Sequence, residues 1–187
     1  ISMTGHQPVI WHAGILAKYL VADALAQQAN GVQARLLIDH ADDDPFSFRV
    51  PVFDDHGITT AHTINLGSNH LAGQPVRSRE ASMPSPLPDL ALALPSVEQG
   101  ALRVRNAFSS HADAPSAAHQ TARALDELIA PSTGYAPSHS VMATALSETN
   151  LYRELVSRML EDPHTMAESY NRAVARFPEA RVAPLAI

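Results

Sequence analysis

The 187-residue sequence contains no cysteine, and this absence excludes several kinds of chemistry at once. A chain without cysteine forms no disulfide bond, offers no thiolate to a metal and has no cysteine nucleophile. The absence of disulfides is compatible with a cytoplasmic protein, and we expect this location.

Charged residues and long apolar runs are also scarce. Charged residues make up 17% of the chain and the formal net charge is −6, without a block of Lys and Arg that would favour nucleic acid as a partner. No apolar run approaches the roughly 20 residues of a membrane-spanning helix, and the first residues do not resemble a signal peptide. We expect a small-molecule substrate, no nucleic-acid or membrane partner, and a chain that is compatible with homo-oligomers.

The two ends of the sequence indicate that it is part of something longer. The chain begins at Ile1 in residues that already resemble a strand, and it ends at Ile187 without a polar tail. We therefore expect the N-terminal part of a longer protein, with part of its site outside these residues.

The segment from Thr4 to Asp44 has the pattern of a strand–loop–helix–strand unit. Residues 2–4 suit the end of a buried strand, and residues 5–8 (Gly-His-Gln-Pro) suit a turn. Apolar residues at helical spacing follow Gly14, and Asn30-Gly31 is typical of a left-handed helix end. The apolar run 34–39 resembles a parallel strand buried on both faces, so the unit predicts a Rossmann-like α/β domain.

In the rest of the chain, the spacing of the apolar residues changes twice. Alternation around residues 46–66 predicts a β-hairpin inserted in the α/β domain. Residues 68–96 form a Pro-rich connection. Helices are predicted near 96–109, 114–130, 148–160 and 163–177, with Thr149 or Ser147 and Asp162 as N-caps and a short strand at 141–144. We expect the apolar residues Met142, Leu146, Leu151, Leu155, Met159 and Leu160 to pack in a core.

The fold class predicted is therefore α/β, a Rossmann-like parallel sheet with an inserted hairpin and a helical C-terminal portion. Residues 1–80 are the first half of the Rossmann-like domain, and residues 81–187 are the Pro-rich connection and the helical region.

Two loops carry the residue types of a binding site. A loop between a strand end and a helix start is where α/β sheets place ligands, and free N–H groups there attract anions. The first loop and its helix give the cofactor-binding candidates Gly5, Gln7, His12, Gly14 and Lys18 and the catalytic candidate His6. The end of the second strand gives the catalytic candidate His40 and the substrate-binding candidates Asp39 and Asp42.

Other interpretations of these residues stay open. One is that Gly5 and Pro8 only shape a turn while Trp11 fills the core. Another is that the acidic run forms a solvated loop, and this interpretation is preferred for Asp43 and Asp44. His56, His62 and His70 lack the close spacing of a zinc motif, so no metal ligand is assigned. Residues 109–111 and 138–140 contain Ser and His, but no GxSxG motif surrounds the serines, as a hydrolase nucleophile would require.

The first quarter of the chain resembles the bacillithiol-biosynthesis cysteine-adding enzymes. The resemblance lies in residues 4–8 (Thr-Gly-His-Gln-Pro), Gly14, the helix with Lys18, and residues 39–42 (Asp-His-Ala-Asp). The chain departs from that family at His6, which replaces a Gln, and at Pro8. It is also similar to uncharacterised bacterial proteins with a GHQP-type opening and a late helix like residues 170–177.

The resemblance implies a Rossmann-like, nucleotidyltransferase-related enzyme that binds ATP or ADP and ligates an amine- or amino-acid-like substrate. Two alternatives are a non-catalytic module that binds a small molecule or sugar phosphate, and a metal-dependent hydrolase that uses the histidines and residues 39–44.

Overall fold

The computed structural model describes all residues except 55, 58, 68–72, 90–93, 179–182 and 187. The chain forms two compact units, Ile1–Thr144 and Ala145–Ile187. The first unit includes two helices and a strand that the sequence analysis grouped with residues 81–187, because this strand returns to the sheet that the first residues begin.

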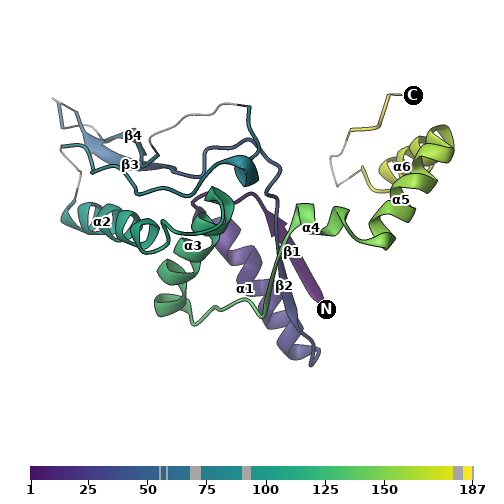
Figure 1. Ribbon diagram of the computed structural model, residues 1–187, viewed down its shortest axis with the longest axis horizontal. Helices are drawn as coiled ribbons and strands as arrows, with labels where there is room; N and C mark the ends of the chain where they lie inside the picture. Colours follow the sequence, from purple (N-terminus) through teal and green to yellow (C-terminus); the bar gives the residue numbers. More distant parts are fainter. Residues whose placement is uncertain (55, 58, 68–72, 90–93, 179–182, 187) are drawn as a thin grey trace. The chain divides into compact units, whose positions relative to one another are not determined.

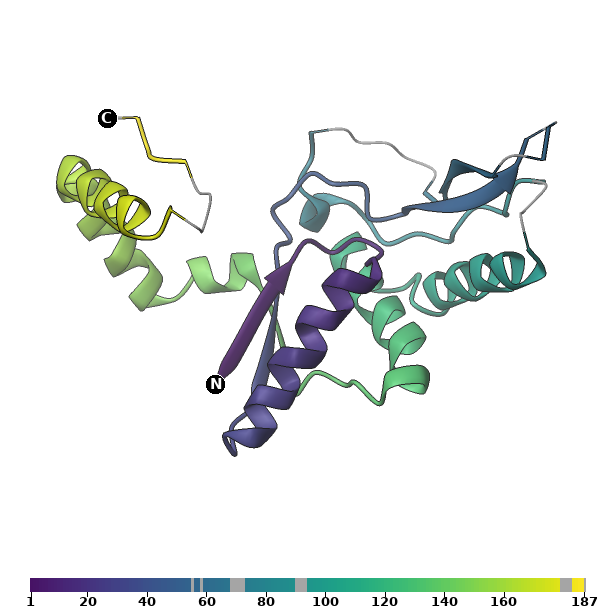
Figure 2. The ribbon, with the colours of Figure 1, turned by 180° about the vertical axis from the view of Figure 1, so that it is seen from behind.

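The first unit is built on a parallel sheet of three strands, β1 (Ser2–His6), β2 (Gln33–Leu37) and β5 (His139–Met142), in the order β1-β2-β5. Helix α1 (Ala13–Gln28) connects β1 to β2 and packs along both strands (Figures 1 and 2). Asn30 has φ 50°, the left-handed conformation that was predicted for the end of this helix. The predicted strand–helix–strand unit is confirmed, and the fold is a mixed α/β fold.

Strand β1 is longer than predicted, because Gly5 and His6 belong to it and not to the loop. They pair with Leu36 and Leu37 of β2. A Cβ on Gly5 would lie 3.3 Å from the Cβ of Leu36, so the glycine permits this close approach of the two strands. Gly5 therefore has a packing role that its turn-like sequence context concealed.

Strand β5 is displaced from the predicted strand 141–144. His139 and Ser140, predicted as loop, pair with Ala34 and Arg35 of β2. Ala143 and Thr144 instead begin the short helix α4 (Ala143–Ser147). Pairing with β2 overrides local pattern here, as is common for short strands.

The predicted hairpin is confirmed as β3 (Ser47–Phe53) and β4 (Thr59–Asn65), which pair antiparallel in a sheet of their own. Asp44 fixes its base, because the carboxylate accepts hydrogen bonds from the backbone N–H of Phe46 at 3.0 Å and from Nδ2 of Asn65 at 2.9 Å. Asp44 is thus part of the hairpin's framework.

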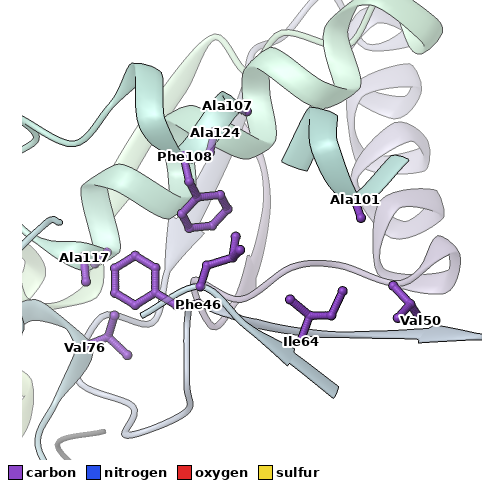
Figure 3. Packing of buried hydrophobic residues seen from close by; sticks show 11 residues of the cluster. Phe46, Val50, Ile64, Val76, Ala101, Ala107, Phe108, Ala117 and Ala124 are labelled. Carbon is purple, nitrogen blue, oxygen red and sulfur yellow. The ribbon is translucent and has the colours of Figure 1, made fainter. Parts of the chain in front are cut away.

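The main apolar core lies between this hairpin and two helices, α2 (Pro95–Ser110) and α3 (Ala117–Thr133), whose positions agree with the predicted helices. Figure 3 shows the ring of Phe46 beside that of Phe108, an edge contact with centroids 5.6 Å apart. Val76, in the 3-10 helix η1 (Val76–Ser78), packs in the same cluster. The connection also wraps against this core, since Gln120 exchanges hydrogen bonds with the backbone of Ser82.

The sheet face under α1 and α3 has a polar centre. Arg35 of β2 is 1% exposed, and its Nη1 and Nη2 donate to the carboxylate of Asp126 at 2.5 and 2.8 Å. Its Nε and Nη2 also donate to the Ser140 hydroxyl at 3.2 and 2.9 Å. The ring of Trp11 stacks on Tyr19 with centroids 4.3 Å apart, and the Arg35 guanidinium lies 5.8 Å from the Trp11 ring. This cluster ties β2 to α1, α3 and β5.

The second unit contains α5 (Asn150–Glu161) and α6 (Pro163–Arg176), with the N-caps Thr149 and Asp162 as predicted. The expected core is wrong for α5, where Leu151 and Leu160 are 77% and 74% exposed and Leu155 and Met159 are also exposed. Met142 of β5 does pack against the core of the first unit, and Leu146 is half-buried. Helical spacing predicts an apolar face, but it does not say what covers that face. In the described part of the chain, no helix combines the length and the apolar character that crossing a membrane requires.

Candidate functional site

The three parallel strands end together, as the sequence predicted for β1 and β2. His6 pairs with Leu37, and Leu37 pairs with Met142, so the segments that follow start at one edge of the sheet. The backbone N–H of Ile38 continues the pairing by donating to the His6 carbonyl at 3.0 Å. This carboxyl edge is where open α/β sheets bind ligands.

Lys18 reaches this edge from the first turns of α1. Its Nζ donates to the carbonyl oxygen of Gly5 at 2.7 Å, while the side chain stays exposed. Lys18 is also the only lysine in the sequence. The ammonium group is therefore held at the end of β1 with donors left for an anion.

His12 caps the start of α1, because its Nδ1 accepts a hydrogen bond from the N–H of Gly14 at 3.1 Å. Nδ1 therefore carries no proton in this arrangement, and a neutral ring has its proton on Nε2. A Cβ on Gly14 would lie 3.1 Å from Cε1 of His12. The close approach that Gly14 permits is thus that of the His12 ring.

The other residues of the first loop are held by local contacts. Nδ1 of His6 lies 3.2 Å from the carbonyl oxygen of Gln7, and both side chains are half-buried. Pro8 is buried and Trp11 packs on Tyr19, which fixes the loop between β1 and α1. Trp11 is half-buried and packs beside the buried Tyr19 without being part of the main core.

At the end of β2, Asp39 is 3% exposed and its carboxylate is engaged inside the protein. It accepts hydrogen bonds from the backbone N–H of Thr144 at 3.0 Å and from the Thr144 hydroxyl. This pair joins the ends of β2 and β5 and leaves the carboxylate little access to a ligand. His40 and Asp42, in contrast, are exposed.

Two residues near this edge were missed by the sequence analysis. Arg79 is 7% exposed and its Nη2 donates to the carbonyl oxygen of Asp42 at 2.7 Å. The second is His119 in α3, whose Nδ1 lies 2.9 Å from the hydroxyl of Ser116, the N-cap of that helix. Only the Ser-x-x-His spacing after Pro115 offered a sequence signal, and this signal indicates a cap and not a site.

The electrostatic surroundings of His119 connect it to the end of β2. Burial and the nearby positive charge of Arg123 lower the pKa of His119, and the negative charge of Asp39 opposes this effect. The imidazole, Arg123 and the Asp39 carboxylate therefore act on one another at the start of α3.

Ser109, Ser110 and His111 have partners within the helices. The hydroxyls of Ser109 and Ser110 donate to the carbonyl oxygens of Arg105 and Asn106 in their own helix, at 3.1 Å each. Nε2 of His111 lies 3.1 Å from the carboxylate of Glu127. These bonds are those of helix packing, and they do not align a hydroxyl with a base.

Among the residues that the structure describes, no three or more His, Asp or Glu side chains are grouped as a metal ion would need. His56 and His62 are exposed near the hairpin, and His70 lies outside the described residues. A groove of about 800 Å³ lies between α2 and α3, and Arg103, Glu127 and Leu128 are among its lining residues. It is near the C-terminal end of α3, whereas His119 is near the N-terminal end of that helix.

Comparison of the chain with protein-family models, with curated proteins and with solved structures gives no match.

Proposed function

We propose that the carboxyl edge of the β1-β2-β5 sheet binds an anionic small molecule, with ATP or ADP as the expected ligand, in a Rossmann-like domain of the nucleotide-binding class. The observation that carries the proposal is the Lys18 ammonium held 2.7 Å from the Gly5 carbonyl oxygen at the end of β1. An ammonium at a strand end beside a helix start suits a phosphate group, because its charge and donors add to those of the helix.

The neighbouring residues support an anion more than a cation. With Nδ1 of His12 accepting from Gly14, the Nε2–H of the neutral ring is a further donor. The Asp39 carboxylate is 3% exposed and accepts hydrogen bonds from Thr144, so it is turned to the protein interior. We assign phosphate binding to Lys18, His12 and Gln7.

The proposal also assigns chemical roles to residues at this edge of the sheet. By the resemblance of residues 4–42, the reaction would be a ligation or nucleotidyl transfer in the cytoplasm, with His6 and His40 as catalytic groups. Asp42, which is exposed, would contact the second substrate. Asp39 would instead position the edge through Thr144, since it is 3% exposed.

Selective labelling of Lys18 tests the proposal. An amine-reactive reagent modifies one side chain in this sequence, so peptide mass spectrometry follows Lys18 directly. We expect ATP or ADP to protect Lys18 from labelling and to raise the melting temperature. The thermal effect should be lost in Lys18→Gln and kept in Lys18→Arg. Arg153→Gln, at an exposed position in α5, is the matched control.

An unchanged labelling rate and an unchanged melting temperature across ATP, ADP and inorganic phosphate would overturn the proposed site. A second candidate is a module that binds a small molecule and catalyses no reaction. It is favoured by the Asp39 carboxylate, which was assigned to the substrate but is hydrogen-bonded to Thr144. Protection of Lys18 without any turnover of ATP over a panel of amines would select that candidate.

A further inference from the structure

The guanidinium group of Arg79 is buried without a carboxylate partner. Arg79 is 7% exposed, and its Nε and Nη2 donate to the carbonyl oxygen of Gln74 at 3.1 and 2.9 Å. Nη2 also donates to the carbonyl oxygen of Asp42 at 2.7 Å. These acceptors are peptide dipoles and none of them carries a full negative charge.

A buried charge normally has a counter-charge, because the loss of hydration is otherwise left uncompensated. In the part of the chain that the structure describes, no carboxylate lies within ion-pair distance of Arg79. This holds although Asp42 binds Arg79 through its backbone carbonyl and Glu80 is the next residue in the chain. The charge is thus offset by carbonyl groups alone.

One end of the guanidinium also has no hydrogen-bond partner. Nη1 donates to no described residue, and it is not one of the enclosed side-chain atoms that lack a partner, which are Nε1 of Trp11, OH of Tyr19 and Nε2 of Gln33. Nη1 is therefore not fully enclosed, and its two N–H groups are left for an acceptor that comes from solution.

The backbone around Arg79 places it at the carboxyl edge of β2. The N–H groups of Val76 and Arg77 donate to the carbonyl oxygens of Ala41 and Asp39 at 2.8 and 2.9 Å. On its other side, the Arg79 carbonyl accepts from the N–H of Ala117 at 2.9 Å, at the start of α3. The guanidinium is held between the segment after β2 and this helix.

We propose that Nη1 of Arg79 binds a phosphoryl oxyanion at the end of β2. A carboxylate prefers the parallel N–H pairs of a guanidinium, and both such pairs here are already used in part by Gln74 and Asp42. Phosphoryl groups share this preference for paired N–H donors, but a phosphoryl group also binds through a single oxygen and brings a larger negative charge than a carboxylate. The inference rests on the proposed function only for the use of this sheet edge as a ligand site.

Titration of the whole chain with inorganic phosphate, followed by amide NMR at constant ionic strength, tests this position. We expect saturable shifts at residues 41, 42 and 76–79, and not at residues 150–161 of the second unit. Acetate at the same ionic strength is the second arm and should give no saturable shift. Equal saturation by acetate would overturn the phosphoryl assignment, and no saturation by phosphate would overturn the position itself.

Two variants sharpen the test. Arg79→Gln should weaken phosphate binding by about tenfold or more, since one charge-assisted hydrogen bond is lost, and Arg153→Gln should leave it unchanged. An unaltered affinity in a folded Arg79→Gln chain contradicts the inference; if that variant does not fold, the wild-type titration decides alone. Lys18→Gln separates the two proposals, because it should abolish the rise in melting temperature caused by nucleotide and leave the phosphate shifts at Arg79 in place.

Discussion

Two arginines of the first unit are buried to a similar degree, but only one of them has a carboxylate partner. Arg35 is 1% exposed and is bound through Nη1 and Nη2 to Asp126 of α3. Arg79 is 7% exposed and is bound to the carbonyl oxygens of Gln74 and Asp42. The same side chain thus has its charge neutralised in one place and only partly offset in the other.

The difference separates a structural role from a ligand-binding one. Near Arg35, the buried atoms without a hydrogen-bond partner belong to neutral side chains such as Tyr19 and Gln33. The charge of Arg35 itself is paired with that of Asp126. Around Arg79 the missing partner is a negative charge, and Nη1 has no hydrogen-bond partner among the described residues. In our proposal a phosphoryl ligand supplies this charge, as Asp126 does for Arg35.

The largest effect should come from making Arg35 resemble Arg79. Asp126→Ala removes the carboxylate and leaves a guanidinium that is 1% exposed without a counter-charge. We expect a loss of about 2–3 kcal/mol in the free energy of unfolding, at the low end for a broken buried pair because Asp126 is partly solvated. Urea denaturation measures this loss.

The reverse change is the control for that loss. Arg35→Met leaves the Asp126 side chain, which is 36% exposed, for water to solvate, so it should destabilise the chain less than Asp126→Ala. If Arg35→Met is the more harmful change, the packing and the Ser140 hydrogen bonds of Arg35 outweigh its charge, and the comparison with Arg79 loses its basis.

A smaller effect should appear at high pH through the phenol of Tyr135. Burial raises the pKa of Tyr135 to about 12 from the ordinary 10.0, although Arg35 and the hydrogen bond to Gln33 act against it. The folded state therefore holds this proton more tightly than the unfolded state. Stability should be complete below pH 10 and should fall by up to about 1.4 kcal/mol per pH unit between pH 10 and 12 for this group.

Unfolding free energies measured across that range check the effect. Burial also raises the pKa of Tyr19, so Tyr135→Phe should reduce the slope and not abolish it. A slope that Tyr135→Phe leaves unchanged would show that the phenol is solvated, and that the cluster around Arg35 is more open than its 1% exposure indicates.

The sequence predicted the elements well, because their patterns are local. Alternation identified β3 and β4, and the strand end followed by a helix with Lys18 identified the first loop. The partners of Asp39 and Arg79 could not be predicted in this way. Asp39 is bound to Thr144, 105 residues away, and Arg79 to Asp42, 37 residues away.

Arg79 was also concealed by its context. It lies in a Pro-rich connection without helical or strand periodicity, where sequence patterns predict no burial. The connection is ordered by bonds to other elements, such as that between Ser82 and Gln120, and these depend on the tertiary fold. Local pattern thus places the residues of the first loop in the fold, and it misses contacts such as those of Asp39 and Arg79, whose partners are distant in the sequence.

The smallest effect should come from His12, which satisfies one exposed donor and carries no buried charge. His12→Ala removes the acceptor for the Gly14 N–H and should cost about 1 kcal/mol or less, the usual contribution of a helix N-cap. His12→Asn keeps a capping oxygen and should restore most of that loss, which urea denaturation can resolve. A loss as large as that of Asp126→Ala would mean that the His12 ring holds the whole β1–α1 loop in place. The exposed end of β1 would then depend on a single side chain as much as the buried face of the sheet depends on Arg35.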